Sequence, residues 1–154
     1  MRKFFAVVLV LMLAVPAFAE DAFVKQVQIG RDGSGMTWWL IDYGSDYDSY
    51  YAVARKYYTS EAVKSDTIEK LISRNRVPEK KAKALYFTEY RYEYTADGSQ
   101  YAQSYVRHYD MLGKLIYKID YDNSTGARRK YFVKVVKNSI QSKGLAYAMG
   151  KIKK

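Results

Sequence analysis

Few side chains in this sequence have the character of catalysts. The single histidine, His108, lies in a segment that alternates apolar and polar residues, so it is expected within a strand as a structural or surface residue. The chain has no cysteine to act as a nucleophile, no nucleophile-elbow serine and no Gly-rich phosphate loop. We therefore expect a protein that is not an enzyme, with no catalytic residue and no cofactor site.

Acidic residues offer the remaining routes to catalysis or metal binding. Glu89 and Glu93 share one face of a predicted strand, and carboxylates can act as general acids and bases. Arg91 lies between them on that face, so a surface ladder of alternating charge explains the pattern better. The aspartates within residues 42–48 do not match the spacing of a calcium-binding EF-hand loop. A zinc site lacks its usual ligands, and we expect no metal.

Tyrosine is the residue type that stands out, with 17 copies. Its ring buries well while its hydroxyl reaches water, so it fills the edges of cores. The same stiff, amphipathic ring also serves in protein-binding surfaces. Core filling accounts for most of these tyrosines, and the candidate partner surface is formed by two rows on adjacent predicted strands. These rows are Tyr90, Tyr92 and Tyr94, and Tyr101, Tyr105 and Tyr109.

The first 19 residues have the pattern of a secretory signal peptide. A positively charged start precedes an apolar run over residues 4–15, and Ala19 ends a small-x-small cleavage pattern before Glu20. The run is too short for a membrane anchor. We expect cleavage after Ala19 and a mature single domain over residues 20–154, exported to the periplasm or the cell surface without a membrane anchor.

The mature chain is basic and must be held together by packing. Removal of the signal peptide leaves 24 Lys and Arg against 16 Asp and Glu, a net charge of +8. Such a charge suits anionic partners, such as lipid headgroups, wall polymers or acidic glycans, although solubility explains it equally well. No nucleic-acid recognition motif is present, and no disulfide can form.

The elements expected before the opposed tyrosine rows are strands followed by a helix. Alternating and β-branched residues predict strands that end near Ile29, Ile41 and Tyr58, with a loop over residues 42–49 between the last two. The period then changes to that of an amphipathic helix ending near Arg74. Its start is either Ser60 or Asp66, because Asp66 and Glu69 also have the spacing of a capping box.

The tyrosine rows lie in a predicted three-stranded antiparallel meander. Its strands cover residues 85–94, 101–109 and 114–121, and the turns between them are marked by Asp97-Gly98 and by Gly113. A further strand over residues 131–136 and a short C-terminal helix follow. The fold class is therefore α+β: a single antiparallel β-sheet of about six strands, one helix inserted near residues 60–75, and a C-terminal helix packed on one face. The two helices should cover one face and leave the other aromatic and exposed.

The order of elements resembles the surface-adhesin E-like domain of bacterial exported proteins. The residues that carry this resemblance are WWLID (Trp38 to Asp42), YYAVARKYY (Tyr50 to Tyr58), YFTEYRYEY with YVRHYDMLGKLIY, and VVKNSIQSKGLAYAMG (Val135 to Gly150). The resemblance implies a single antiparallel sheet with a C-terminal helix against one face. Paired cysteines and a tail proline, common in that family, are absent from this sequence.

Characterised members of that family are adhesins that bind extracellular-matrix and serum proteins of a host and can dimerise. The resemblance thus implies an exported, non-enzymatic binding module of the bacterial envelope, with a matrix or serum protein or an anionic polymer as partner. The alternative is a structural protein of the envelope that forms a homodimer through its tyrosine-rich face. A fold alone does not choose between them.

Overall fold

The computed structural model describes residues 26–123 and 126–152. The predicted signal peptide and its cleavage site at Ala19 and Glu20 lie outside these residues. Within them, the chain forms one antiparallel sheet and three helices, which confirms the predicted α+β class.

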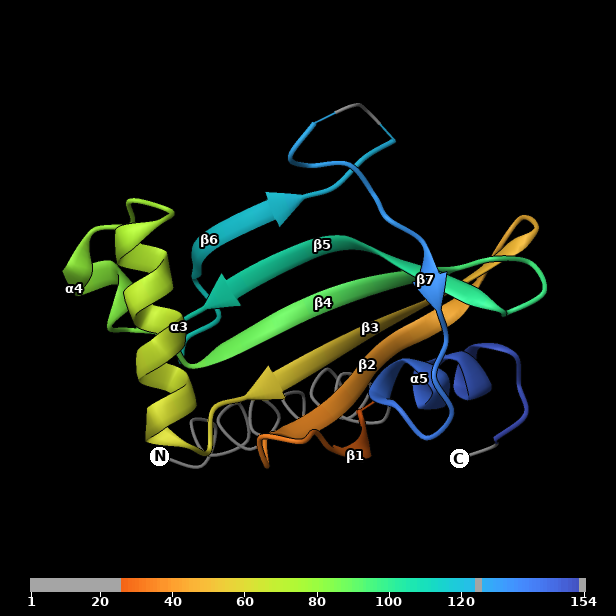
Figure 1. Cartoon of the computed structure of the whole chain (residues 1–154). Helices are drawn as coiled ribbons and strands as arrows, with labels where there is room; N and C mark the ends of the chain where they lie inside the picture. Colours follow the sequence, from red (N-terminus) through yellow and green to blue (C-terminus); the bar gives the residue numbers. More distant parts are fainter. Residues whose placement is uncertain (1–25, 124–125, 153–154) are drawn as a thin grey trace, which may run out of the picture.

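The sheet is a meander in which each strand pairs with the next one along the chain, in the order β1 to β6 (Figure 1). A short seventh strand pairs with the start of β5. The strands are β1 (Val27–Arg31), β2 (Thr37–Asp46), β3 (Ser49–Tyr57), β4 (Phe87–Tyr94), β5 (Gln100–Tyr109), β6 (Leu115–Asp120) and β7 (Val133–Lys134).

Serine side chains cap the two longer helices, α3 (Glu61–Ser73) and α5 (Ile140–Ala148). The hydroxyl of Ser60 accepts a hydrogen bond from the backbone N–H of Val63, and Ser139 does the same for Ser142. The inserted helix therefore begins after Ser60. Asp66 lies inside that helix, where its carboxylate pairs with Lys70 one turn later, at 2.6 Å.

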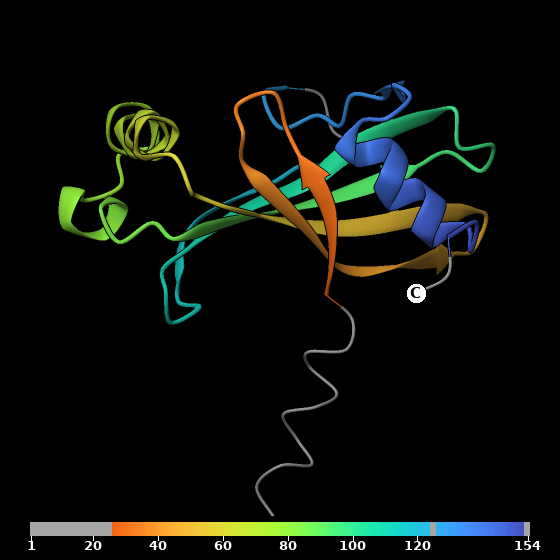
Figure 2. The same cartoon turned by 90° about the horizontal axis from the view of Figure 1, so that it is seen from below.

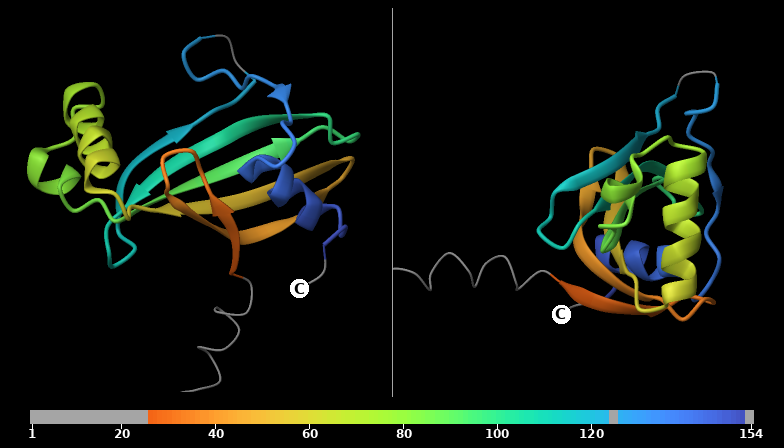
Figure 3. Two further views of the ribbon diagram at one scale, coloured as in Figure 1. Left: turned by 60° about the horizontal axis from the view of Figure 1, so that its bottom comes forward. Right: turned by 90° about the vertical axis from the view of Figure 1, so that its left-hand side faces the viewer.

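Helices α3 and α5 lie on the same side of the curled sheet, at its opposite ends (Figures 2 and 3). Helix α5 packs across β1, β2 and β3, and its Leu145 joins a core with Leu40, Ala52 and Tyr94. Gly144 allows this close approach: a Cβ there would lie 3.0 Å from the Cβ of Ala52. We call the side of the sheet under these helices the helix face.

A second, smaller core forms at the other end of the molecule. Leu71 of α3 packs with Ala82, which belongs to the one-turn helix α4 (Glu79–Ala82), and with Ile116 of β6. The lysine-rich segment that follows α3 thus contains a helical turn with one buried apolar residue. No helix within the described residues is long and apolar enough to cross a bilayer.

The loop prediction for residues 42–49 is wrong. Strand β2 continues to Asp46, and a tight turn around Tyr47 leads directly into β3. Strand β1 pairs only with the first part of β2, up to Leu40. The second part of β2 therefore pairs with β3 alone, and a strand at the edge of a sheet carries polar residues such as Asp42 without loss. The strand predicted over residues 131–136 is reduced to β7.

Candidate partner-binding surface

The face of the sheet opposite the two helices carries a dense array of tyrosine, arginine and glutamate side chains. We call it the open face. Its position follows from strand pairing, because residues directly opposite each other on adjacent strands point to the same side. On β3, β4 and β5 the open face comprises Tyr51, Arg55, Tyr57, Phe87, Glu89, Arg91, Glu93, Tyr105, Arg107 and Tyr109, and it continues onto β2 with Trp39 and onto β6 with Asp120.

Glu89 is the centre of the polar contacts on this face. One carboxylate oxygen of Glu89 accepts a hydrogen bond from the hydroxyl of Tyr105 at 2.8 Å, and the other pairs with the guanidinium of Arg55 at 3.2 Å. Burial, followed by the nearby Glu89, raises the pKa of Tyr105, so its hydroxyl keeps its proton and donates. Three strands are tied together by this group, which holds the tyrosine ring in one orientation.

Stacked planar groups surround that centre. The guanidinium of Arg55 lies 4.2 Å from the ring centroid of Phe87, and the ring of Tyr109 stacks on Phe87 at 4.9 Å. Arg107 lies over Tyr105 at 4.0 Å. Stacking of this kind restricts long side chains before any partner arrives, which lowers the entropy cost of binding.

The charges of the open face are balanced by pairs. Arg91 lies over the ring of Tyr51 at 4.4 Å and 3.9 Å from the carboxylate of Glu93. Glu93 also pairs with Lys130 at 2.6 Å, and Arg107 pairs with Asp120 at 3.5 Å. Glu89, Arg91 and Glu93 do share one face of β4 as predicted, but Glu89 is buried there. Glu89 contacts Arg55 and Tyr105 on the neighbouring strands, whereas Glu93 pairs with Arg91 on its own strand and with Lys130 in a loop.

The structure divides the six predicted surface tyrosines between the two faces. Tyr92 and Tyr94 lie in the core under α5, with exposed fractions of 3% and 1%, and Tyr90 and Tyr101 pack against that core. The hydroxyl of Tyr94 donates to the backbone oxygen of Gln141, at 2.8 Å. The prediction that the first row is a partner surface is therefore wrong.

A β-bulge explains why the second row is split. Gln103 pairs with Tyr92 and Tyr105 pairs with Arg91, so Ser104 is an extra residue on β5. Tyr101 precedes the bulge and contacts Tyr92 on the helix face, with ring centroids 5.6 Å apart. After the bulge, the odd-numbered residues of β5 point to the open face instead of the helix face. Tyr105 and Tyr109 consequently lie on the open face and are the only two of the six that remain candidates.

The lone histidine belongs to a buried polar chain on the helix face. The hydroxyl of Tyr58 lies 2.8 Å from that of Thr88, which lies 2.8 Å from Nδ1 of His108. Burial, and secondarily the charge of Lys56, lowers the pKa of His108 to about 4, so its ring is neutral at pH 7. This arrangement connects β5 to β4 and to the segment leading into α3, and it supports a structural role for His108.

Lys56 is a partly buried cation beside that chain. Its ammonium lies 5.3 to 5.7 Å from the ring centroids of Trp38, Tyr58 and Tyr90, and it forms no ion pair with any described residue. Burial lowers the pKa of Lys56. Three aromatic rings thus replace part of its hydration. No group of three or more acidic or histidine side chains suited to a metal occurs in the described part of the chain.

The sequence matches no known protein-family model, and comparison with curated proteins and with solved structures found no significant match. The resemblance to the surface-adhesin E-like domain therefore stays a prediction.

Sequence reasoning missed two arginines of the open face, Arg55 and Arg107. Both lie at strand positions that alternate with buried residues, and this alternation could have placed them on the face opposite the core. Their partners, Glu89 and Asp120, lie on neighbouring strands, so the contacts could be found only once the strand register was known.

Proposed function

We propose that the protein is an exported, non-enzymatic binding module of the bacterial envelope that binds a protein partner through the open face. The observation that carries the proposal is that both long helices lie on the other side of the sheet, which leaves ordered rings and guanidinium groups facing solvent. Tyrosine and arginine are the residue types enriched in the energetic centres of protein interfaces.

The size of the open face suits a protein partner. Strands lie about 4.8 Å apart and rise about 3.4 Å per residue, so five strands over eight residues span roughly 19 by 27 Å. This flat area of about 500 Å² corresponds to a larger accessible area once side chains roughen it, and standard interfaces bury about 800 Å² on each partner. A single modest interface would occupy the face.

The distribution of charge favours a protein over an anionic polymer at this face. Its cations Arg55, Arg91 and Arg107 each have a carboxylate neighbour on the same face. A uniformly anionic chain would have to displace those carboxylates or leave them opposite like charge. A protein surface with charges of both signs meets no such conflict. The resemblance adds that extracellular-matrix and serum proteins are the partners to test first.

The test is a binding panel of matrix and serum proteins on a biosensor, using the mature chain. We expect binding by the wild type and a loss of at least tenfold in the Tyr105→Ser, Arg91→Ala double variant, because each removes contact area at the centre of the face. A matched control, Tyr47→Ser with Arg74→Ala, changes exposed residues elsewhere. No binding in the panel, or an equal loss in both double variants, would contradict the proposal.

A homodimer is the second candidate, because a face with balanced, alternating charges can be complementary to its own copy across a two-fold axis. Sedimentation velocity separates the two functions. A dimer in the wild type that becomes a monomer in the same Tyr105→Ser, Arg91→Ala variant would favour self-association, whereas a monomer at all concentrations would remove it.

A further inference from the structure

An apolar tip is held rigidly at the turn between β5 and β6. Met111 and Leu112 are 72% and 88% exposed. A carboxylate oxygen of Asp110 accepts hydrogen bonds from the backbone N–H groups of Leu112 and Lys114, at 2.9 and 2.8 Å, and Gly113 takes a positive φ of 76°. Polar residues are usual at such turns. Here the turn is fixed and presents two large apolar side chains to solvent.

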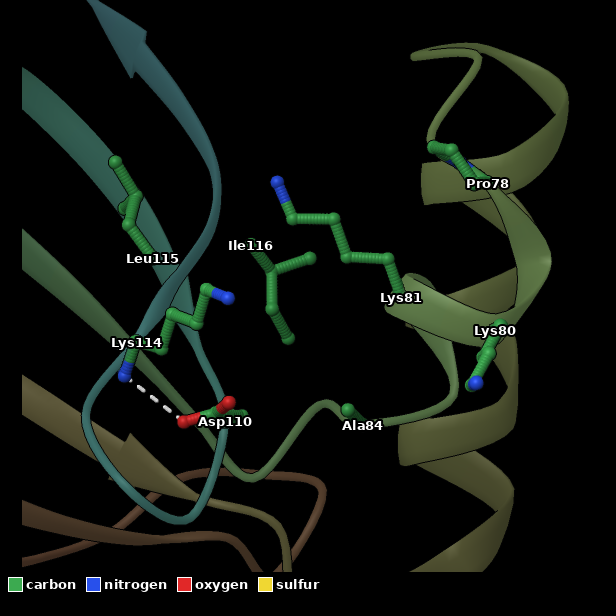
Figure 4. Close-up of a pocket in the computed structure, with 8 residues that line it drawn as sticks. All are labelled: Pro78, Lys80, Lys81, Ala84, Asp110, Lys114, Leu115 and Ile116. Atoms are coloured by element: carbon green, nitrogen blue, oxygen red, sulfur yellow. Dashed lines mark hydrogen bonds between the residues drawn. The ribbon is translucent and has the colours of Figure 1, made fainter.

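A pocket of about 400 Å³ lies between this turn and the lysine-rich helix α4 (Figure 4). Its lining is mostly apolar, with Ile116 and the half-exposed Leu115 on the β6 side and Ala84 on the other. The side chain of Lys81 extends from α4 toward Ile116, across the space between the two elements (Figure 4). The volume is in the range of sites that hold small ligands or parts of larger ones.

Positive charge borders both the pocket and the tip. Lys80, Lys81 and Lys114 line the pocket, and none of them forms an ion pair with a described residue. The carboxylate that lines the pocket with them, that of Asp110, accepts hydrogen bonds from two backbone N–H groups of the turn. Three ammonium groups therefore remain available to an external anion beside exposed apolar side chains.

We propose that this end of the molecule docks on an anionic phospholipid bilayer. Met111 and Leu112 enter the boundary between headgroups and acyl chains, and Lys80, Lys81 and Lys114 contact lipid phosphates. The pocket accepts part of one lipid at its apolar wall. Buried apolar side chains together with flanking lysines are the two signals that hold peripheral proteins on anionic membranes.

A bilayer fits these features better than another protein or a soluble anion does. Two side chains on a narrow turn give too small an apolar area for a protein interface of standard size. A soluble anion would use the lysines and leave the apolar tip in water. The open face is built from other residues, so membrane docking at this end does not depend on the function proposed above and is tested separately from it.

The first test measures insertion of the tip directly. Because the chain has no cysteine, Leu112→Cys can be labelled at one position with an environment-sensitive fluorophore. A matched control is Tyr47→Cys, at the fully exposed turn between β2 and β3. We expect a blue shift for residue 112 alone, with vesicles containing phosphatidylglycerol and not with pure phosphatidylcholine. No shift, or equal shifts at both positions, would overturn the proposal.

The second test separates the tip from the lysines by vesicle sedimentation. Leu112→Ser should weaken binding on the order of tenfold. Changing Lys80, Lys81 and Lys114 to Gln should weaken vesicle binding about fivefold for each lysine. Added salt should also weaken vesicle binding of the wild type, because it screens the same charges. The control changes Lys134, Lys137 and Lys151 to Gln, which keeps the same net charge. An equal loss in both triple variants would show a general charge effect and contradict the proposal.

A final arm distinguishes a bilayer from a dispersed lipid. Short-chain phosphatidylglycerol below its critical micelle concentration offers the same headgroup without a surface. If it shifts the residue-112 fluorophore as vesicles do, the site binds single amphiphiles and docking on a bilayer is contradicted. We expect no shift with the dispersed lipid.

Discussion

The two faces of the sheet use the same residue types in opposite ways. On the helix face, Tyr92 and Tyr94 are enclosed by α5, and buried polar atoms find partners such as the backbone oxygen of Gln141. On the open face, the hydroxyl of Tyr105 donates to Glu89 and its ring lies under the guanidinium of Arg107, while Tyr109 stacks on Phe87. Tyrosine content alone therefore does not predict which tyrosines stay uncovered; the element lying over each strand face decides it.

The largest effect should come from removing a helix-face ring. Tyr94→Ala deletes a side chain that is 1% exposed, together with its hydrogen bond to α5, and should lower the free energy of unfolding by about 4 kcal/mol. Tyr109→Ala, on the open face, should cost about 1 kcal/mol because that ring is already partly exposed to solvent. Urea denaturation of both variants measures the contrast, and equal losses would break the distinction between the faces.

Acid should destabilise the helix face through His108. Its folded-state pKa of about 4 is below the unfolded value of about 6.5. The unfolded chain therefore binds a proton first as pH falls. The contribution of neutral His108 is fully present above pH 6.5 and is lost between pH 6.5 and 4, about 3 kcal/mol in total.

The comparison with His108→Asn isolates this contribution. Unfolding free energies of wild type and variant, measured at pH 7 and pH 4.5, should differ in slope, with the variant less sensitive to acid. Carboxylates that titrate in the same range act on both proteins alike. Parallel pH profiles would show that His108 does not carry the effect.

A smaller effect is expected where α5 meets the sheet. Gly144→Val would place side-chain atoms against the Cβ of Ala52 and the hydroxyl of Tyr94, which lie 3.0 and 3.1 Å from an ideal Cβ. Overpacking of this kind costs about 2 kcal/mol. Gly33→Ala is the control, since nothing lies within 4 Å of its ideal Cβ. Differential scanning calorimetry should show a lower Tm for the first variant and little change for the second.

The smallest stability effect is expected for an open-face charge. Arg107→Ala removes a half-exposed stack on Tyr105 and an ion pair with Asp120, at a cost within about 1 kcal/mol. Binding of a partner at the open face should nevertheless weaken clearly. Chemical denaturation and biosensor binding on the same preparation test both halves. A large stability loss would indicate that the open face is part of the framework after all.

Sequence patterns predicted the fold class, both long helices and the faces of β4, because alternation and capping are local properties. They failed at β5, where one extra residue, Ser104, reverses the alternation through pairing with another strand. They also failed for residues 42–46, whose polar character reflects an edge position rather than a loop. The apolar tip at Met111 and Leu112 was readable as two unusual turn residues. The pocket beside it depends on where α4 lies, so it could not be predicted from the sequence.

The strand order has a kinetic consequence. Since each of β1 to β6 pairs with its neighbour in sequence, most of the sheet forms by closing short loops, and folds rich in such local contacts cross their barrier quickly. Helix α5 is the exception, because it must return from the end of the chain to cover β1 to β3. Until it arrives, the aromatic surface over Tyr92 and Tyr94 faces water, so the interval before helix docking is when this chain is most prone to aggregate.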